Sequence, residues 1–226
     1  MPAAQARKKG GRRLGRPPAA ESAETRERIL RAARGCFAEF GYASTTNREI
    51  GERAGLTAGA IYHYFDSKVQ LFAAVTEQVV TRIFDEFEQV IVSSPNFVDR
   101  VRKLLDVAVV LHREDASLAR FSTIYPVELL RHEELAAQIP VELWDRGISF
   151  FARLAEEAIE AGELAPDVAA ADVANMLLSV TTGLAHFATL DQSLERHRAA
   201  VIVVERLFDG SLMSSRKAAA HAAGGD

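Results

Sequence analysis

The most restrictive feature of the sequence is the spacing of its apolar residues, which follows the period of an α-helix from about residue 22 to residue 209. Apolar residues recur three and four positions apart, and no segment alternates apolar and polar residues as a half-buried strand does. Hydrophobic residues make up 48% of the 226, which argues against disorder of the whole chain. The pattern predicts an all-α protein of about nine or ten helices.

Capping residues, glycine and proline predict the helix boundaries. We expect the first helix over 22–40, with Ser22 as its N-cap and the permissive Gly41 at its end. The segment Thr46-Asn47-Arg48-Glu49 has the form of a capping box, and Ser67 opens a second segment of this kind. The predicted helices after the first span 46–54, 57–64, 67–92, 97–112, 115–125, 127–137, 140–162, 167–190 and 192–209.

A proline in the middle of the chain leaves two structures open. Pro126 removes the donor that would pair with the carbonyl of Ser122 in a continuous helix. It is therefore either the first residue of a new helix or a kink inside one helix.

The helices predicted over 46–54 and 57–64 form a helix-turn-helix pattern around Gly55. The second helix of such a motif enters a DNA major groove about 12 Å wide, so its first residues must be small or hydrogen-bonding. Thr57, Ala58, Gly59 and Ala60 meet this requirement. The amides at the start of that helix also favour a phosphate group.

At these residues the sequence resembles a known family. The segment 41–68, GYASTTNREIGERAGLTAGAIYHYFDSK, is similar to the DNA-binding region of TetR-family transcriptional regulators. The strong resemblance covers about 25–75, and the remainder is similar in helical layout and length only. Gly51 departs from the family pattern, which usually has Ala there; Gly costs about 1 kcal/mol of helix propensity but permits a close helix crossing.

The resemblance implies a set of DNA-contacting residues. These are Thr46, Asn47, Arg48, Thr57, Ala58, Gly59, Ala60, Tyr62, His63, Tyr64 and Lys68. Arg48 is expected to reach a guanine edge, the small residues to face the bases, and Lys68 to clamp the DNA backbone. Purely structural roles stay open: the two threonines as caps alone, Tyr64 with its ring partly packed, and Lys68 as a solvated charge.

The start of the chain is basic, whereas the remainder is acidic. Residues 1–70 carry 13 basic and 7 acidic residues, and residues 71–226 carry 14 and 24. This asymmetry indicates a polyanionic partner for one end only. Within the basic start, Arg13-Leu14-Gly15-Arg16-Pro17-Pro18 resembles an AT-hook core, which would place Arg13 and Arg16 in a narrow minor groove. The alternative is a basic tail with non-specific, salt-dependent affinity.

Two helices near the end of the chain have the spacing of helix-bundle seams. Residues 173–190 contain no Asp, Glu, Lys or Arg, and 18 residues of this composition indicate a buried helix rather than a membrane span. The residues predicted at a dimer interface are Leu177, Val180, Leu184, Phe187, Leu194, His197, Val201, Val204 and Phe208. A helix-turn-helix protein that reads a palindrome needs two-fold symmetry, which favours a homodimer. Packing of both seams within one subunit is the alternative.

The resemblance also implies a ligand cavity beneath the helices of 97–162. The candidate lining residues are Leu105, Val109, His112, Phe121, Tyr125, Trp144, Phe151 and Leu177. Walls of this kind favour a small apolar or aromatic molecule. Tyr125, His112 and Arg120 are the candidate polar anchors.

These patterns predict four segments: a disordered basic arm over 1–20, a helix-turn-helix DNA-binding domain over 21–68, a helical effector-binding and dimerisation domain over 69–210, and a disordered tail over 211–226. No motif of a hydrolase, a phosphate loop or a zinc protease occurs, and Cys36 lies on the apolar face of its helix. We therefore expect no enzyme, no cofactor, no metal and no membrane partner.

The predicted function is that of a cytoplasmic homodimeric regulator on double-stranded DNA. We expect it to bind a palindromic operator and to be released by a small molecule. That it represses rather than activates is an expectation taken from the family alone. A ligand-independent architectural DNA-binding protein is the alternative.

Overall fold

The computed structural model describes residues 19–191 and 193–213, and within these ranges the chain is helical and contains no strand. The predicted all-α class is confirmed. The helices are α1 (Ala19–Ser44), α2 (Asn47–Ala54), α3 (Ala58–Ile61), α4 (Lys68–Ile91), α5 (Phe97–Glu114), α6 (Ala116–Arg131), α7 (Glu133–Ala136), α8 (Val141–Glu160), α9 (Ala170–Leu190) and α10 (Leu194–Phe208).

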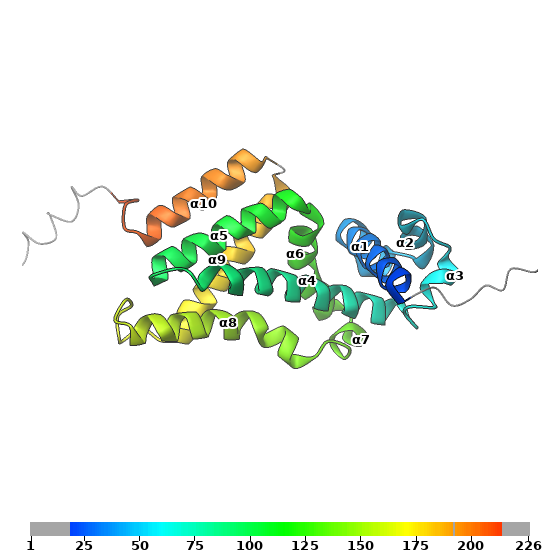
Figure 1. Cartoon of the computed structure of the whole chain (residues 1–226), viewed down its shortest axis with the longest axis horizontal. Coiled ribbons are helices and arrows are strands. Elements are labelled where there is room, and N and C mark those ends of the chain that lie inside the picture. The colour runs from blue at the N-terminus through cyan, green and yellow to red at the C-terminus, as the bar shows by residue number, and fades with distance from the viewer. Residues whose placement is uncertain (1–18, 192, 214–226) are drawn as a thin grey trace, which may run out of the picture.

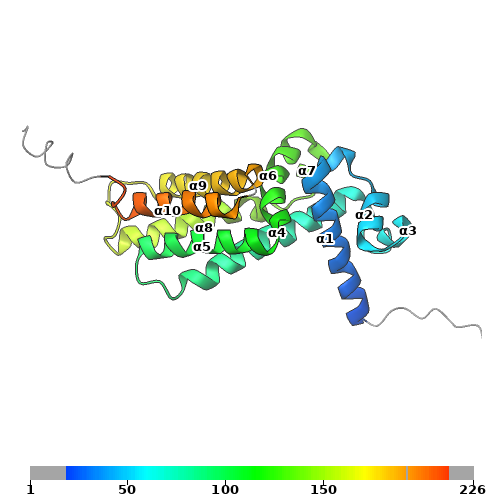
Figure 2. The same ribbon diagram turned by 90° about the horizontal axis from the view of Figure 1, so that it is seen from above.

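The helices form a small unit and a larger bundle that one long helix connects. Helices α1–α3 lie at one end of the elongated molecule, and α5, α8, α9 and α10 form the other end (Figure 1). Helix α4 extends from the small unit into the bundle, and α6 lies between the two parts (Figure 2). We call α1–α3 the reading head.

Most predicted boundaries in the reading head are confirmed, but the start of α1 and the end of α3 are wrong. Helix α1 begins at Ala19, before Ser22, since the alanines and Glu21 at its start are good helix formers. Gly41 interrupts α1 with φ of 76° and ψ of 172°, so the helix breaks at the predicted residue and glycine permits the positive φ, but ψ differs from that of the left-handed cap that the sequence predicts. Thr46, Thr57 and Ser67 cap α2, α3 and α4.

The predicted helix break at Pro126 is wrong. Helix α6 runs through Pro126 to Arg131, and α7 is a separate short helix after it. Pro126 removes a single backbone donor, whereas Leu118, Phe121 and Leu129 hold α6 in the core on both sides of it. Of the two alternatives, the proline inside one helix is therefore the one observed.

The reading head and the start of the bundle share one hydrophobic core. Phe37 of α1 lies 5.1 Å from Phe72 of α4, measured between ring centroids, and Phe72 lies 5.3 Å from Phe121 of α6. All three side chains are fully buried. The core therefore crosses the boundary predicted between residues 68 and 69.

Some residues of the two predicted helix-bundle seams are buried within a single chain. Leu177, Leu184, His197 and Val201 are buried in the single chain, so the prediction that they face a partner needs correction. Leu177, Leu184 and Val201 belong to the second core cluster, together with Phe150 and Phe151 of α8. Apolar residues spaced three and four positions apart identify a face that is buried. They cannot show whether the same chain or a partner chain covers that face. Val180, Val204 and Phe208 are half-buried, and 37% of Phe187 and of Leu194 is exposed.

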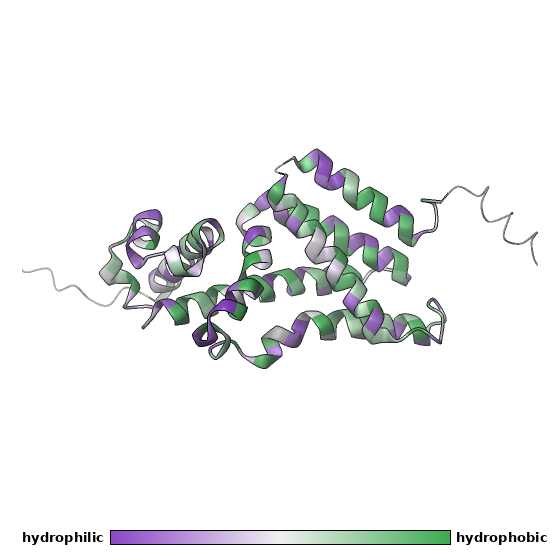
Figure 3. Cartoon of the chain, turned by 180° about the vertical axis from the view of Figure 1, so that it is seen from behind, coloured by the Kyte–Doolittle hydropathy of each residue, from purple (hydrophilic) through white to green (hydrophobic). Residues whose placement is uncertain are grey.

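Helix α9 has an exposed face without formal charge between 173 and 190, on which Met176, Phe187 and Leu190 lie among Asn175, Ser179, Thr182 and His186. Among the described residues it is the one helix long and apolar enough to span a membrane, and 28% of its most apolar window is buried. Core helices of soluble proteins meet the same criterion of length and composition. Apolar residues appear in green along α9 and α10 in Figure 3.

Candidate functional site

Reciprocal hydrogen bonds fix the start of α2. The N–H of Glu49 donates to Thr46 Oγ1 over 3.3 Å, and the N–H of Thr46 donates to Glu49 Oε2 over 2.8 Å. The hydrogen bonds that the Glu49 carboxylate accepts from the N–H and from the hydroxyl of Thr46 lower the pKa of Glu49. The predicted capping box is confirmed, and it places Thr46 and Arg48 on the solvent side of the reading head.

The turn between α2 and α3 depends on two glycines. Gly55 adopts the left-handed conformation, with φ of 66° and ψ of 37°. The N–H of Leu56 donates to the carbonyl of Gly51 over 2.8 Å. A Cβ on Gly51 would lie 2.9 Å from the carbonyl oxygen of Leu56, so glycine permits the close crossing that the sequence predicts.

The amino end of α3 is open to solvent. Thr57 and Gly59 are exposed, and the small side chains of Ala58 and Ala60 are half-buried. Thr57 Oγ1 accepts the N–H of Ala60 over 3.2 Å, which caps the helix without covering its end. Helix α3 is shorter than predicted, since residues 62–64 form turns. This end of α3 therefore presents backbone and small side chains to solvent.

The flanking residues divide into exposed and packed ones. Tyr62 is 56% exposed and His63 is exposed, whereas Tyr64 packs against the core. The Arg48 side chain is 83% exposed, and its Nε lies 2.9 Å from Glu52 Oε1. Such a surface ion pair is weak and can be exchanged for another acceptor. Asn47 is half-buried with its Oδ1 enclosed, so this oxygen does not face solvent.

The prediction that Lys68 clamps DNA is wrong. Its Nζ donates to the carbonyls of Tyr42, Ala43 and Thr45 over 2.9, 3.3 and 3.0 Å. An ammonium group has three protons, so all of its donors are used within the protein. The Nζ also lies 4.4 Å from the centre of the Tyr42 ring, and burial lowers the pKa of Lys68. Lys68 therefore joins the end of α1 to the start of α4.

The two predicted minor-groove residues, Arg13 and Arg16, lie outside the described residues.

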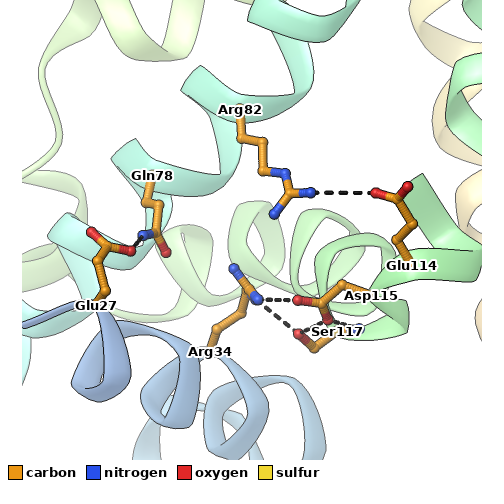
Figure 4. Close-up of polar contacts among 7 residues, drawn as sticks. All are labelled: Glu27, Arg34, Gln78, Arg82, Glu114, Asp115 and Ser117. Carbon is orange, nitrogen blue, oxygen red and sulfur yellow. Dashed lines mark hydrogen bonds and ion pairs between the residues drawn. The ribbon is translucent and has the colours of Figure 1, made fainter. Parts of the chain in front are cut away.

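A set of polar contacts links the reading head to the bundle (Figure 4). Arg34 of α1 is 4% exposed; its guanidinium pairs with Asp115, and its Nε donates to Ser117 Oγ over 2.8 Å. Asp115 is the N-cap of α6 and accepts the N–H of Ser117 over 3.0 Å. Burial lowers the pKa of Arg34, and the charge of Asp115 opposes this. No periodic pattern in the sequence singles out Arg34.

Two more exposed contacts complete this region. Gln78 Nε2 donates to Glu27 Oε2 over 2.6 Å, and Arg82 lies 3.6 Å from Glu114 (Figure 4). We call the seven residues the polar junction: Glu27, Arg34, Gln78, Arg82, Glu114, Asp115 and Ser117. The polar junction ties α1 to α4 and to the start of α6.

A pocket of about 130 Å³ lies in the bundle between α4, α5, α6, α8 and α9. Helix α4 contributes Phe84 and Phe87, and α8 contributes Phe151. Helix α6 contributes Leu118, Ala119, Ser122 and Tyr125, which begin three residues after the N-cap Asp115. The wall of the pocket and the polar junction therefore share one helix.

Comparison with known proteins identifies the family. Residues 29–75 match the family described as "Bacterial regulatory proteins, tetR family". The HTH-type transcriptional repressor BepR of Brucella suis is 30% identical over 174 residues, covering 73% of this chain and 80% of BepR. The chain belongs to the tetR family. It is thus a transcriptional regulator with a helix-turn-helix DNA-binding region.

A second regulator and a solved structure are also similar to this chain. The HTH-type transcriptional regulator UidR of Escherichia coli K12 is 29% identical over 164 residues, covering 73% of this chain and 81% of UidR. The crystal structure of FadR from Bacillus subtilis in complex with stearoyl-CoA has a TM-score of 0.67 and 18% identity, and it covers 83% of this chain and 99% of FadR. At that identity the likeness supports the fold alone.

The pocket of this TetR-family regulator contains some of the predicted ligand residues. His112, Tyr125 and Phe151 line it. The remaining described candidates do not line the pocket and pack within the two core clusters instead, so their prediction as lining residues is wrong: Leu105, Val109, Phe121 and Leu177. The Trp144 side chain lies outside the described residues. The prediction missed the α4 residues, since their apolar stripe is equally typical of a core helix.

We predict that Lys68→Met destabilises the protein without changing electrostatic DNA binding. The substitution leaves carbonyls of residues 42, 43 and 45 without their donor, so the free energy of unfolding should fall by about 1–3 kcal/mol in urea titrations. The salt dependence of DNA affinity should stay unchanged. Arg48→Gln is the control, which should keep the stability and lower the affinity about tenfold or more. A reduced salt dependence in Lys68→Met would contradict the structural role.

We predict that Arg34→Met lowers the free energy of unfolding by about 2–4 kcal/mol, because it leaves a partly buried carboxylate unpaired. The control is Arg82→Met, which removes a pair with side chains 42% and 54% exposed and should cost at most about 1 kcal/mol. Chemical denaturation measures both values. An equal fall in the free energy of unfolding of the two variants would show that the Arg34–Asp115 pair stabilises the protein no more than the exposed Arg82–Glu114 pair.

Proposed function

We propose that this TetR-family regulator is a homodimeric repressor that leaves a palindromic operator when a small apolar or aromatic molecule enters the pocket. The observation that carries the proposal is the position of α6. Its N-cap, Asp115, holds Arg34 of the reading head, and its next turns line the pocket. A molecule that moves α6 therefore acts on the reading head through a direct contact.

In this proposal the exposed end of α3 enters the major groove. Thr46, Thr57 and Tyr62 bond phosphates, while Arg48 and His63 reach base edges. Their exposure supports these roles. The small residues of α3 offer no long side chain, so we expect modest discrimination from each half-site. Arg13 and Arg16 of the basic arm supplement it in the minor groove.

We place the dimer interface on the outer faces of α9 and α10. The exposed residues of α9 between 173 and 190 carry no formal charge and include Met176, Gly183 and Phe187. An added Cβ at Gly183 would meet nothing within 4 Å, so a partner helix can approach closely. Helix α10 exposes Ile202, Val203 and Leu207. Burial of these apolar faces favours association.

Two-state linkage explains release. Two reading heads bind one operator when they are about 34–36 Å apart, one turn of DNA. A molecule that binds more tightly to a state with another separation shifts the population towards that state. The name of the relative BepR supports repression as the sign of regulation. A regulator of DNA acts where the chromosome is, which supports the cytoplasm as its location.

The decisive experiment is selection of DNA sequences by the purified chain, followed by footprinting of the enriched site. We expect one palindrome with a footprint confined to it. Continuous coverage of DNA without a preferred sequence would instead favour the architectural alternative. Candidate molecules are then added to the bound operator, and unchanged affinity at saturating ligand would contradict release.

We predict that Phe187→Glu yields a monomer, because it places a charge on the uncharged exposed face of α9. Multi-angle light scattering measures the mass, and operator affinity should fall by about 100-fold or more since two linked heads bind far more tightly than one. Val92→Glu, at a residue that is 84% exposed outside α9 and α10, is the control and should remain dimeric. A dimeric Phe187→Glu with full operator affinity would place the interface elsewhere.

A further inference from the structure

The walls of the bundle pocket lack side chains that could balance a charged ligand. None of the described residues that line the pocket is Asp, Glu, Lys or Arg. Arg120, which the sequence analysis names as a candidate polar anchor, is half-buried on α6 but does not line the pocket, so that prediction is wrong. An ion that enters such a site loses its hydration and gains no partner of opposite charge in return. The walls therefore favour a ligand without charge.

Three polar side chains in the walls have hydrogen-bonding groups that the described chain does not use. The hydroxyls of Tyr125 on α6 and Thr182 on α9 form no hydrogen bond among the described residues. Nδ1 of His112, on α5, is buried and unpaired within the same part of the chain. By contrast, Ser122 Oγ already donates to the carbonyl of Ala119 over 2.8 Å. The pocket thus offers a few hydrogen bonds to an uncharged polar group.

Tyr125 is the best placed of these groups to hold a ligand. Its ring stacks on the fully buried Phe121, with ring centroids 6.0 Å apart and ring planes at 19°. Thr182, in contrast, is exposed, so it lies at the rim of the pocket. Burial raises the pKa of Tyr125, which keeps its hydroxyl protonated and able to donate. Burial and then the charge of Arg120 lower the pKa of His112, which favours a neutral imidazole.

The size and the aromatic walls of the pocket limit the apolar part of the ligand. The volume is about 130 Å³. An apolar cavity of about 150 Å³ in another protein binds benzene, so one aromatic ring is the appropriate scale here. Phe84 meets Phe87 and Phe151 edge to face, with ring planes at 86° and 76°. A further ring can join such an arrangement.

We infer that the pocket binds an uncharged, single-ring aromatic molecule with one hydroxyl or carbonyl oxygen, and that this oxygen accepts a hydrogen bond from Tyr125. The ring of the ligand lies among the three phenylalanines, and His112 is a second hydrogen-bond partner. The inference rests on the proposed function, in which this pocket is the effector site. Tyr125 and Asp115, the partner of Arg34, belong to one helix, so the hydrogen bond ties the ligand to the helix that contacts the reading head.

Calorimetry of the full chain with four probes of similar size tests the ligand class. Benzyl alcohol and toluene are uncharged, benzoate is an anion, and benzylamine is a cation. We expect benzyl alcohol to bind at least about tenfold more tightly than either ion. An ion that binds as tightly as benzyl alcohol, or no binding of benzyl alcohol at millimolar concentration, would overturn the inference.

Removal of single hydroxyls locates the oxygen of the ligand. Tyr125→Phe keeps the ring, so it should weaken the binding of benzyl alcohol about fivefold and leave that of toluene within about twofold. Ser122→Ala is the matched control, because its hydroxyl proton is already bonded to the backbone, and it should change neither affinity by more than about twofold. Unchanged affinity for benzyl alcohol in Tyr125→Phe, or an equal loss for both probes, would overturn the role of Tyr125.

A substitution that fills the pocket tests the place of binding. Ala119→Leu enlarges a side chain of the wall, so both uncharged probes should bind about tenfold more weakly or not at all. Ala136→Leu, at an exposed alanine of α7, is the control and should leave both affinities unchanged. Unchanged affinities in a folded Ala119→Leu would place binding outside the pocket and overturn the inference. If Ala119→Leu does not fold, Tyr125→Phe decides alone.

Operator binding separates this inference from the proposed function. Binding of the ligand-free protein to a selected palindrome tests the function by itself. Release of the operator by benzoate but not by benzyl alcohol would overturn the uncharged class and leave the function intact. Failure to select any palindrome would overturn the function, while calorimetry would still decide the ligand class.

Discussion

Continuity of one hydrophobic core through the reading head and the bundle is the constraint on which the rest of the structure depends. Phe72 of α4 contacts Phe37, Tyr42 and Phe121, so one side chain joins three helices. Close-packed interiors transmit displacements because few voids absorb them. The position of the reading head therefore depends on that of α6. A change in the bundle that moves α6 must be accommodated by the whole of this core.

The polar junction makes the contact between the reading head and α6 sensitive to geometry. A buried ion pair contributes little net stability compared with apolar packing, but it is sensitive to geometry. The Arg34–Asp115 contact joins α1 to the N-cap of α6. Leu118, the first residue of α6 that lines the pocket, follows within one helical turn. In the proposed mechanism, apolar packing holds the two parts together, and the ion pair favours one arrangement of them.

Local signals in the sequence predict the motif well because they act within a few residues. The caps at Thr46, Thr57 and Ser67 and the turn at Gly55 depend on nearby atoms alone. The errors concern tertiary contacts. Whether Lys68 faces DNA or three carbonyls, and whether Leu177 faces a partner or its own core, depends on elements distant in the sequence. Helical spacing likewise could not show that α4 lines the pocket.

The proline inside α6 has a mechanical consequence. Without an N–H at Pro126, the carbonyl of Ser122 has no donor in the helix ladder, and a helix bends more easily where a rung is absent. Ser122 itself lines the pocket. Helix α6 is therefore expected to bend most easily beside the pocket, between Asp115, which contacts Arg34 near its start, and Glu128, whose carboxylate lies against Gly41 of α1. In the proposed mechanism, a ligand too large for the pocket would bend α6 at this point first.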